Sequence, residues 1–215
     1  MRLGFVTSNK GKHKELQTRL SDLGYEVVQL SISYPELQAD SIDEVTRFGL
    51  DWINRKINDK TIEIASIETV ELIIIEDSGL FVHALNDFPG VYSKFVFNTI
   101  GYIGVLELLK NNLDRTAHFE SCIGVLGLEA YTGANNGRSG KINTEISNTI
   151  QLVKGRCTGV ISPTPRGNKG FGFDPIFIPE GATKTFAEMD TGEKNKYSHR
   201  GKAMEKFVEF LKKRY

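Results

Sequence analysis

The chain has 215 residues, of which 40% are apolar and 25% are charged, so it can bury a core and does not have the composition of a disordered protein. Its formal net charge of +0 argues against a broad nucleic-acid-binding surface. No apolar run is long enough to span a membrane, and "MRLGFVTSNK" lacks the apolar stretch of a secretory signal. We therefore expect a cytoplasmic protein with no membrane or nucleic-acid partner, whose cysteines, Cys122 and Cys157, are buried and reduced.

Strands and helices are expected to alternate along the chain. Leu16 and Leu20 have helical spacing before a stop at Gly24, and Ser41 is a candidate N-cap of the second helix. In chain order we expect a strand at 2–8, a helix at 9–24, a strand at 25–32, a helix at 41–59, a strand at 70–77, a helix at 101–112, a hairpin of strands at 117–128 and 149–162, and a helix at 198–215. This order predicts a single α/β domain over 1–215, with an antiparallel stretch in its second half and a long mobile polar loop at 132–148.

The first candidate site is "TSNKGK", at the join between the first strand and the first helix. The backbone N–H groups of a helix N-terminus attract anions, and two lysines add positive charge there. The spacing of the glycines is not that of a P-loop. The segment therefore predicts a phosphate site formed by Thr7, Ser8, Asn9, Lys10, Gly11 and Lys12, with a capped helix start and solvated lysines as the alternative.

The second candidate is "LIIIEDSG", in which the carboxylates Glu76 and Asp77 follow a buried apolar run and Ser78-Gly79 is expected to form a sharp turn. In open α/β sheets, ligands bind beyond the carboxyl ends of strands. A hard cation such as Mg²⁺, held by carboxylates and substrate phosphates, would offset the cost of burying these charges. Glu36, in the loop after the second strand, is a further candidate ligand. The alternatives are that Asp77 only caps a turn and that Glu36 is solvated.

The third candidate is the segment from "GNKGFGFDP" to "EKNKYSHRGKA". It combines glycines and the aromatic residues Phe171 and Phe173 with polar groups further along the chain, namely Asp174, Lys194, Ser198, His199 and Arg200. A nucleobase pocket needs a stacking surface and hydrogen-bonding groups on the base edge. The alternative is a glycine-rich loop over the core followed by an ordinary C-terminal helix.

Six motifs in order resemble the inosine triphosphate pyrophosphatase family: "SNKGKHKE", "PELQAD", "EDSGLFVHALNDFPGVYS", "GFGFDPIFIP", "FAEM" and "EKNKYSHRGKA". The resemblance covers residues 3 to about 211. It implies an elongated mixed β-sheet flanked by helices, two lobes with a nucleotide-binding cleft between them, and a homodimer. It also implies hydrolysis of ITP, dITP and XTP to the monophosphate and pyrophosphate, which cleanses the nucleotide pool, with one Mg²⁺ per subunit and Mn²⁺ as a possible substitute.

The resemblance also implies a role for each matching residue. Thr7 to Lys12 would bind the triphosphate, Glu36 and Asp77 would hold Mg²⁺, and Asp77 would take the proton of a metal-bound water that attacks the α-phosphorus. Ser78 would contact substrate, and Phe171, with Gly172, Phe173 and Asp174, would form the base and sugar pocket. Lys194, His199 and Arg200 would recognise the purine edge, where O6 of inosine and xanthine accepts hydrogen bonds that adenine cannot.

Some points stay open. Many family members have a phosphate-facing lysine in the second helix where this chain has Gly49. Either one phosphate contact is missing here, or Arg47 or Lys56 supplies it. The part played by Glu76 is undecided between support of the metal through water and a local hydrogen bond. The other functions considered are a nucleotide sensor without catalysis, a pyrophosphatase for modified pyrimidines, and a nucleic-acid-binding protein that uses the basic C-terminal helix.

Overall fold

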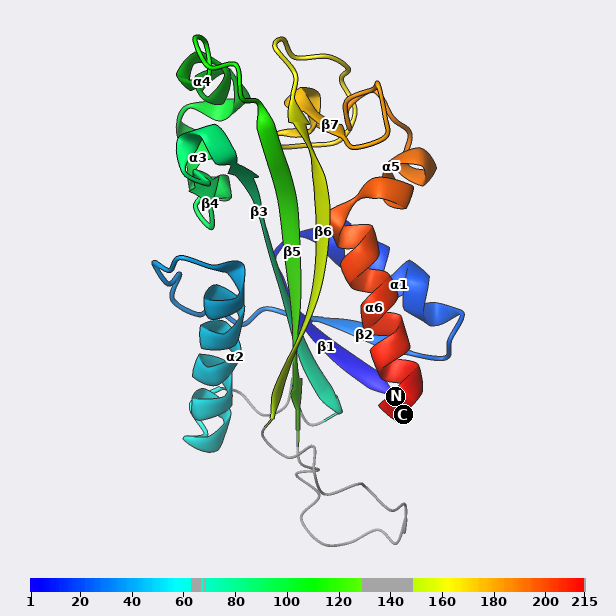
Figure 1. The fold of residues 1–215 in the computed structure, drawn as a ribbon. Helices are drawn as coiled ribbons and strands as arrows, with labels where there is room; N and C mark the ends of the chain where they lie inside the picture. The colour runs from blue at the N-terminus through cyan, green and yellow to red at the C-terminus, as the bar shows by residue number, and fades with distance from the viewer. Residues whose placement is uncertain (63–66, 68, 129–148, 215) are drawn as a thin grey trace, which may run out of the picture. The chain divides into compact units, whose positions relative to one another are not determined.

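The computed structural model describes residues 1–62, 67, 69–128 and 149–214 (Figure 1). The predicted polar loop at 132–148 lies outside the described residues. In chain order the elements are β1 (Arg2–Val6), α1 (Lys10–Ser21), β2 (Glu26–Leu30), α2 (Ile42–Asn58), β3 (Leu72–Val82), the short 3₁₀ helix η2 (His83–Leu85), β4 (Pro89–Gly90), α3 (Ser93–Thr99), α4 (Gly101–Leu108), β5 (Thr116–Gly127), β6 (Ile150–Ile161), the 3₁₀ helix η4 (Asp174–Ile176), β7 (Phe177–Pro179), α5 (Thr191–Tyr197) and α6 (His199–Arg214).

The strands form one mixed sheet in the order β2-β1-β3-β5-β6-β7, with β4 paired to β3. β1 is parallel to β2 and β3, whereas β4 is antiparallel to β3 and β7 is antiparallel to β6. Helices connect the parallel strands, as a parallel pair requires. The predicted α/β class and mixed sheet are confirmed.

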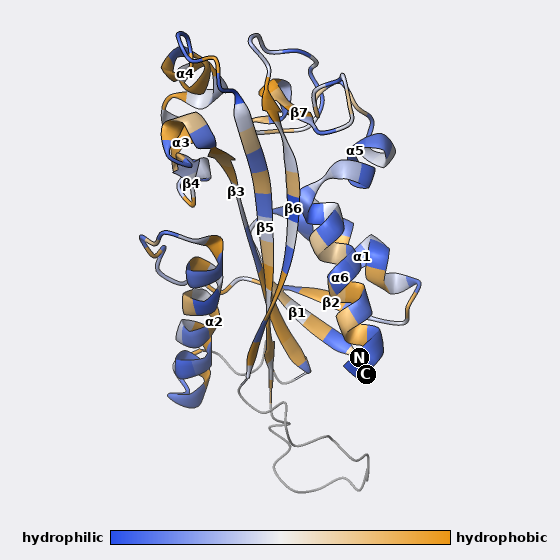
Figure 2. Cartoon of the chain, viewed as in Figure 1, coloured by the Kyte–Doolittle hydropathy of each residue, from blue (hydrophilic) through white to orange (hydrophobic). Residues whose placement is uncertain are grey.

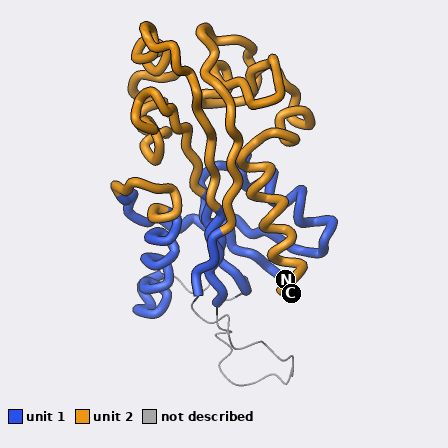
Figure 3. The backbone as a smooth tube through the Cα atoms, viewed as in Figure 1, with its two compact units in different colours: residues 1–37, 46–76, 123–152 blue, residues 38–45, 77–122, 153–215 orange. Residues whose placement is uncertain are grey.

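The chain forms two compact units, each with its own apolar core (Figure 3). Unit 1 comprises residues 1–37, 46–76 and 123–152, and unit 2 comprises residues 38–45, 77–122 and 153–215. The core of unit 1 includes Leu50 and Ile53 of α2 with Ile73 and Ile75 of β3. The core of unit 2 is rich in aromatic residues, with Phe119, Phe173, Phe177 and Phe186 buried together. One of the boundaries between the units falls at the Glu76–Asp77 peptide, inside β3.

The structure corrects the expectation for β3. The strand does not end at Asp77, and Ser78-Gly79 is not a turn, because β3 continues to Val82. Residues 76–78 form a partly exposed stretch within a strand that is otherwise buried. Gly79 is needed for strand pairing: a Cβ there would overlap the carbonyl oxygen of Gly90 in β4 and lie 3.2 Å from Ser93 Oγ. The glycine therefore allows close approach of another strand, which is a known use of glycine in sheets.

Several local predictions are confirmed. Leu16 and Leu20 are buried on α1, and Gly24 closes the turn after it with a φ of +79°. Ser41 Oγ accepts a hydrogen bond from Glu44 N at the start of α2. Cys122 and Cys157 are free and buried. Among the described residues, no helix is both long enough and apolar enough to cross a membrane.

Candidate functional site

In unit 1, the start of α1 forms an exposed segment. Asn9 is the N-cap, and its Oδ1 accepts hydrogen bonds from Gly11 N at 2.9 Å and Lys12 N at 3.1 Å. Thr7 Oγ1 in turn accepts a hydrogen bond from Asn9 N. Residues Ser8 to Gly11 are all exposed to solvent. Because the cap uses two of the N–H groups that we expected to bind phosphate, an anion here would depend on side chains and on the remaining helix-start groups.

Lys12 forms an ion pair with Glu76 across the same unit. Its Nζ lies 2.5 Å from Glu76 Oε2 and donates a further hydrogen bond to the Glu76 carbonyl oxygen at 3.3 Å. The Glu76 side chain is only 3% exposed, so its charge needs a partner inside the protein. Of the two uses considered for Glu76, the structure therefore supports a local interaction, with Lys12.

The two predicted metal ligands lie in different units. Glu36 is an exposed residue of the loop after β2 in unit 1. Asp77 belongs to unit 2 and is partly exposed in the middle of β3, and its Oδ1 accepts a hydrogen bond from Ser78 N at 2.9 Å. Their carboxylate oxygens are the hard donors that Mg²⁺ prefers, and both are reachable from solvent. The chemistry of these residues therefore fits Mg²⁺.

In unit 2, Asp174 is the centre of the residues predicted to form the nucleobase pocket. Its Oδ2 accepts hydrogen bonds from Lys194 Nζ at 2.6 Å and from Phe171 N at 2.8 Å. Asp174 is buried at the start of η4, and Lys194 belongs to α5, which is capped by Asp190. The buried carboxylate therefore holds the Phe171 backbone and the Lys194 ammonium group in fixed positions, as charge-assisted hydrogen bonds do.

Phe171 is 58% exposed, although phenylalanine is usually buried. Lys194 Nζ lies 5.0 Å from the ring centroid and Arg200 Cζ lies 5.4 Å from it. Arg200 also donates a hydrogen bond to Ser78 Oγ at 3.3 Å, which connects the start of α6 to β3. An exposed aromatic ring with two cationic groups beside it offers a stacking surface and hydrogen-bond donors to a planar ligand.

The remaining predicted residues of this group are placed differently from Phe171. Phe173 is buried in the core of unit 2 and makes an edge contact with Phe97 at 5.6 Å, so its ring is a packing group. Gly172 has a φ of +62°, which suits a glycine between the exposed ring and the buried one. The His199 side chain is buried and stacks on Phe119 with ring centroids 4.6 Å apart.

Comparison with known proteins identifies the family. The sequence profile of the Ham1 family matches residues 3–210. The chain belongs to the Ham1 family. It is 45% identical to a dITP/XTP pyrophosphatase of Thermococcus kodakarensis over 212 residues, which cover 99% of this chain and 98% of that protein. It is 43% identical to a dITP/XTP pyrophosphatase of Pyrococcus horikoshii, with coverage of 99% and 97%.

Solved structures of the Ham1 family have the same fold. The Ham1 protein of Staphylococcus aureus superposes with a TM-score of 0.75 at 24% identity and covers all of both chains. A Ham1 protein of Coxiella burnetii gives a TM-score of 0.73 at 26% identity, with 99% of both chains covered. The resemblance that the six sequence motifs indicated is thereby confirmed.

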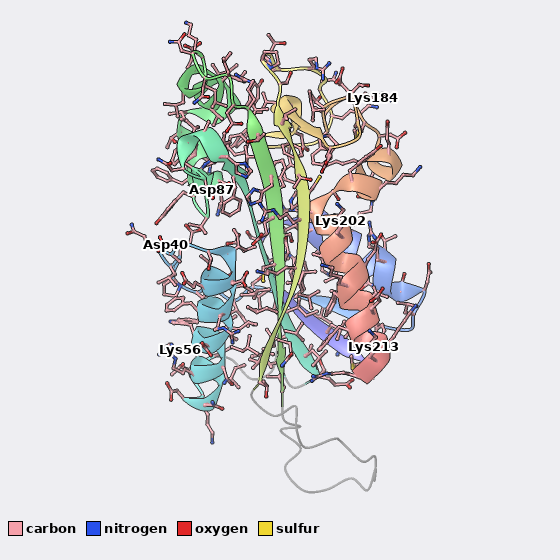
Figure 4. All side chains as sticks on the ribbon, in the orientation of Figure 1. Asp40, Lys56, Asp87, Lys184, Lys202 and Lys213 are labelled. Atoms are coloured by element: carbon pink, nitrogen blue, oxygen red, sulfur yellow. The ribbon has the colours of Figure 1, made fainter. Side chains whose placement is uncertain are left out.

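This Ham1-family chain departs from the expected pattern at Gly49, and the structure explains why a lysine is absent there. A Cβ on Gly49 would lie 2.8 Å from Tyr34 Cε2 and 2.9 Å from Ile75 Cδ1, so the Tyr34 ring occupies the space that a longer side chain would need. Lys56, labelled on α2 in Figure 4, places its Nζ 5.6 Å from the centroid of the Trp52 ring. Arg47 is exposed on the same helix.

Sequence reasoning missed two interactions in these groups. The Lys12–Glu76 pair joins residues 64 positions apart, and the contact of Arg200 with Ser78 spans 122 positions. A carboxylate within a buried strand did indicate that Glu76 needed a cation, but nothing in a single sequence identified Lys12 as that cation.

Proposed function

We propose that this protein is a nucleoside triphosphate pyrophosphohydrolase that converts dITP, ITP and XTP to the nucleoside monophosphate and pyrophosphate. The observation that carries the proposal is the 45% identity, over almost the full length of both chains, to a relative named dITP/XTP pyrophosphatase. The two residue groups described above have the chemistry that the two ends of such a substrate require. A cleansing role for the nucleotide pool follows from this substrate class.

The residues at the start of α1 in unit 1, Thr7 to Lys12, would bind the triphosphate. The exposed segment from Ser8 to Gly11 carries Lys10, and the positive end of α1 adds partial charge to it. Lys12 would contribute less than a free lysine, because its ammonium group already neutralises Glu76. Stabilising the leaving pyrophosphate in this way is a positioning and electrostatic contribution, as in other phosphoryl transfers.

Asp77 would accept the proton of the water that attacks the α-phosphorus. Its carboxylate is partly exposed, and the hydrogen bond from Ser78 N fixes its orientation. Together with Glu36 it would also hold Mg²⁺, which, when bound, would reduce the negative charge that repels an incoming nucleophile. A general base of this kind contributes roughly 10²- to 10⁴-fold to a rate.

The residues around Phe171 in unit 2 would select the nucleobase. Phe171 would stack on the purine, and Lys194 and Arg200, whose cationic groups lie 5.0 Å and 5.4 Å from the centroid of the Phe171 ring, would donate hydrogen bonds to the purine edge. O6 of hypoxanthine and xanthine accepts such hydrogen bonds. Adenine presents an amino group instead, and each buried donor left without an acceptor costs about 1–3 kcal/mol.

The site of attack can be tested with ¹⁸O-labelled water and ITP as substrate. Attack at the α-phosphorus puts the label into the monophosphate, and this is the result we expect. Label in pyrophosphate would mean attack at the β-phosphorus, and label in orthophosphate would mean attack at the γ-phosphorus. Either result would contradict the proposed reaction. Binding of ITP without any labelled product would favour the nucleotide sensor.

We further propose that two copies of the chain form a homodimer through α3 and α4. Large apolar side chains on these helices are exposed, including Phe95 at 68% and Ile103 at 54%. Figure 2 shows the apolar character of α4. An exposed apolar patch of this kind on a globular protein often marks an interface, and the family resemblance makes a second copy the expected occupant.

A further inference from the structure

A second cluster of ligating side chains lies within unit 2, outside the residues that the proposed reaction uses. It consists of His83 in η2, Asp87 in the turn that follows, and His118 on β5. One ligand atom from each of these residues lies within 4.8 Å of the others. Figure 4 labels Asp87, which belongs to the segment between β3 and α3.

We propose that His83, Asp87 and His118 bind a divalent transition-metal ion such as Zn²⁺. His83 Nε2 lies 3.1 Å from His118 Nδ1 and 3.9 Å from Asp87 Oδ1. In a tetrahedral zinc site with metal–ligand bonds of about 2.0–2.1 Å, neighbouring ligand atoms are about 3.3 Å apart. The two separations from His83 Nε2 bracket that value. Two imidazoles and one carboxylate are also a set that favours zinc over Mg²⁺.

The His118 ring is prepared to act as a ligand. Burial, together with the nearby charge of Arg156, lowers the pKa of His118 to about 4, so the imidazole is neutral at pH 7. Its Nδ1 accepts a hydrogen bond from Arg156 NH2 at 3.1 Å, and because a guanidinium group can only donate, this nitrogen must carry its lone pair. The ring stacks on Phe81, with centroids 4.8 Å apart and planes 6° from parallel, which fixes its orientation.

A second set of hydrogen bonds orients His83. Thr116 Oγ1 donates to Asp114 Oδ1 at 2.6 Å, so the hydroxyl oxygen must accept at its other contact, from His83 Nδ1 at 3.0 Å. The proton on Nδ1 turns Nε2 toward the cluster, which is how hydrogen bonds beyond the ligands commonly orient a metal-binding histidine. His83 Nε2 and His118 Nδ1 lie 3.1 Å apart in the structure. A bound metal ion would accept the lone pair of each nitrogen.

Arg156 is the group that opposes metal binding. Its guanidinium occupies the Nδ1 lone pair of His118, and its positive charge repels a cation. Arg156 is an exposed residue of β6, so its side chain can move into solvent. Removal of Arg156 is therefore expected to strengthen metal binding, whereas removal of any of the three ligands weakens it. If the three residues formed only a hydrogen-bonded cluster and no metal site, neither substitution would change the affinity for metal.

The test uses the full chain, stripped of metal with EDTA and exchanged into buffer with excess Mg²⁺, which occupies oxygen-ligand sites. Zn²⁺ alone is titrated by calorimetry, and Co²⁺ is titrated while its visible absorption reports a tetrahedral site. We expect one Zn²⁺ per chain. His83→Ala and Asp87→Asn should each weaken binding by at least about tenfold, as loss of a site residue commonly does, and Arg156→Ala should tighten it.

His13→Gln is the matched control, because the His13 ring bonds to the Val27 carbonyl oxygen and belongs to no such cluster. Its affinity for Zn²⁺ should equal that of the unmodified chain. Circular dichroism of each variant checks that it is folded. Absence of Zn²⁺ binding by the unmodified chain would overturn the proposal, and so would binding that is unchanged in both His83→Ala and Asp87→Asn. Neither result bears on hydrolysis of dITP.

Discussion

At the scale of single residues, Lys12 stabilises the fold by neutralising the buried carboxylate of Glu76. Glu76 is almost inaccessible to solvent and Lys12 is partly accessible, so the carboxylate depends on this lysine for its charge balance. Breaking a buried pair by removing one partner is more harmful than removing both, because one charge is then left uncompensated. Lys12 therefore has a clear stabilising function, whatever it adds to phosphate binding.

Lys12→Met is expected to lower the free energy of unfolding by about 3–5 kcal/mol, since it leaves the Glu76 carboxylate buried without its partner. The double variant Lys12→Met/Glu76→Gln should lose markedly less. Urea unfolding measures both, and Lys10→Met, which changes an exposed lysine of the same segment, is the control. Equal losses in the single and double variants would show that the pair does not carry the stability assigned to it.

Asp77→Asn is expected to reduce kcat for ITP by about 10²- to 10⁴-fold, because an amide cannot accept the proton of the attacking water. Nucleotide affinity should remain measurable by calorimetry, since the amide has nearly the same size as the carboxylate. Glu188→Gln, a matched removal of a carboxylate whose partners are Arg166 and Thr185, serves as the control. An Asp77→Asn variant with more than about a tenth of the original activity would exclude Asp77 as the base.

At the scale of elements, the sequence pattern was sufficient for most strands and helices and failed at β3. Apolar periodicity located α1, α2 and α6 because each has one buried face, and Leu16, Leu20 and Ile42 are all buried as that pattern requires. Ser78-Gly79 has the composition of a turn, yet Gly79 lies inside a strand because β4 approaches it. That requirement comes from a contact with Gly90, which local composition does not encode.

The candidate site was predictable to a similar degree. The motifs predict which residues bind each end of a nucleotide, and this stays a prediction. They did not reveal which of these residues pair with one another. The buried position of the Phe173 ring is an example, because its neighbour Phe97 lies in a helix that was not predicted. Burial of this kind depends on tertiary packing.

Gly79→Ala should destabilise the pairing of β3 with β4, because the new methyl group overlaps the Gly90 carbonyl oxygen and approaches Ser93 Oγ. That hydroxyl joins the two segments by accepting from Leu80 N at 2.8 Å and donating to Gly90 O at 2.7 Å. We expect a loss of about 1–3 kcal/mol or more in the free energy of unfolding, typical of overpacking. Gly192→Ala in α5, where the added Cβ makes only ordinary contact, should change stability far less. Similar values for both would refute this explanation of Gly79.

At the scale of the whole molecule, each unit has its own core and its own group of predicted site residues. The residues proposed to bind the triphosphate belong to unit 1, and those proposed to bind the nucleobase belong to unit 2. One of the points where the chain passes from one unit to the other is Glu76–Asp77, so the residue paired with Lys12 and the proposed general base are consecutive. Any change that disturbs β3 at this point should therefore affect both groups together.

The proposed homodimer is also a property of the whole molecule. Phe95→Glu combined with Ile103→Glu places charges on the apolar surface of α3 and α4, and should convert a dimer to a monomer in analytical ultracentrifugation. Val160→Glu, at an exposed apolar residue of β6, is the control and should leave the mass unchanged. A dimer that persists in the double variant would place the interface elsewhere, and a monomeric unmodified chain would contradict dimerisation.

The most direct test of the central claim is to measure the products released from dITP, ITP, XTP, ATP and GTP at equal concentration, with Mg²⁺ and with EDTA. The account predicts metal-dependent release of monophosphate and pyrophosphate from dITP, ITP and XTP, with ATP and GTP almost untouched. Cleavage of ATP at a similar rate would contradict the proposed selection by Lys194 and Arg200. Release of orthophosphate and a diphosphate would contradict the proposed reaction itself.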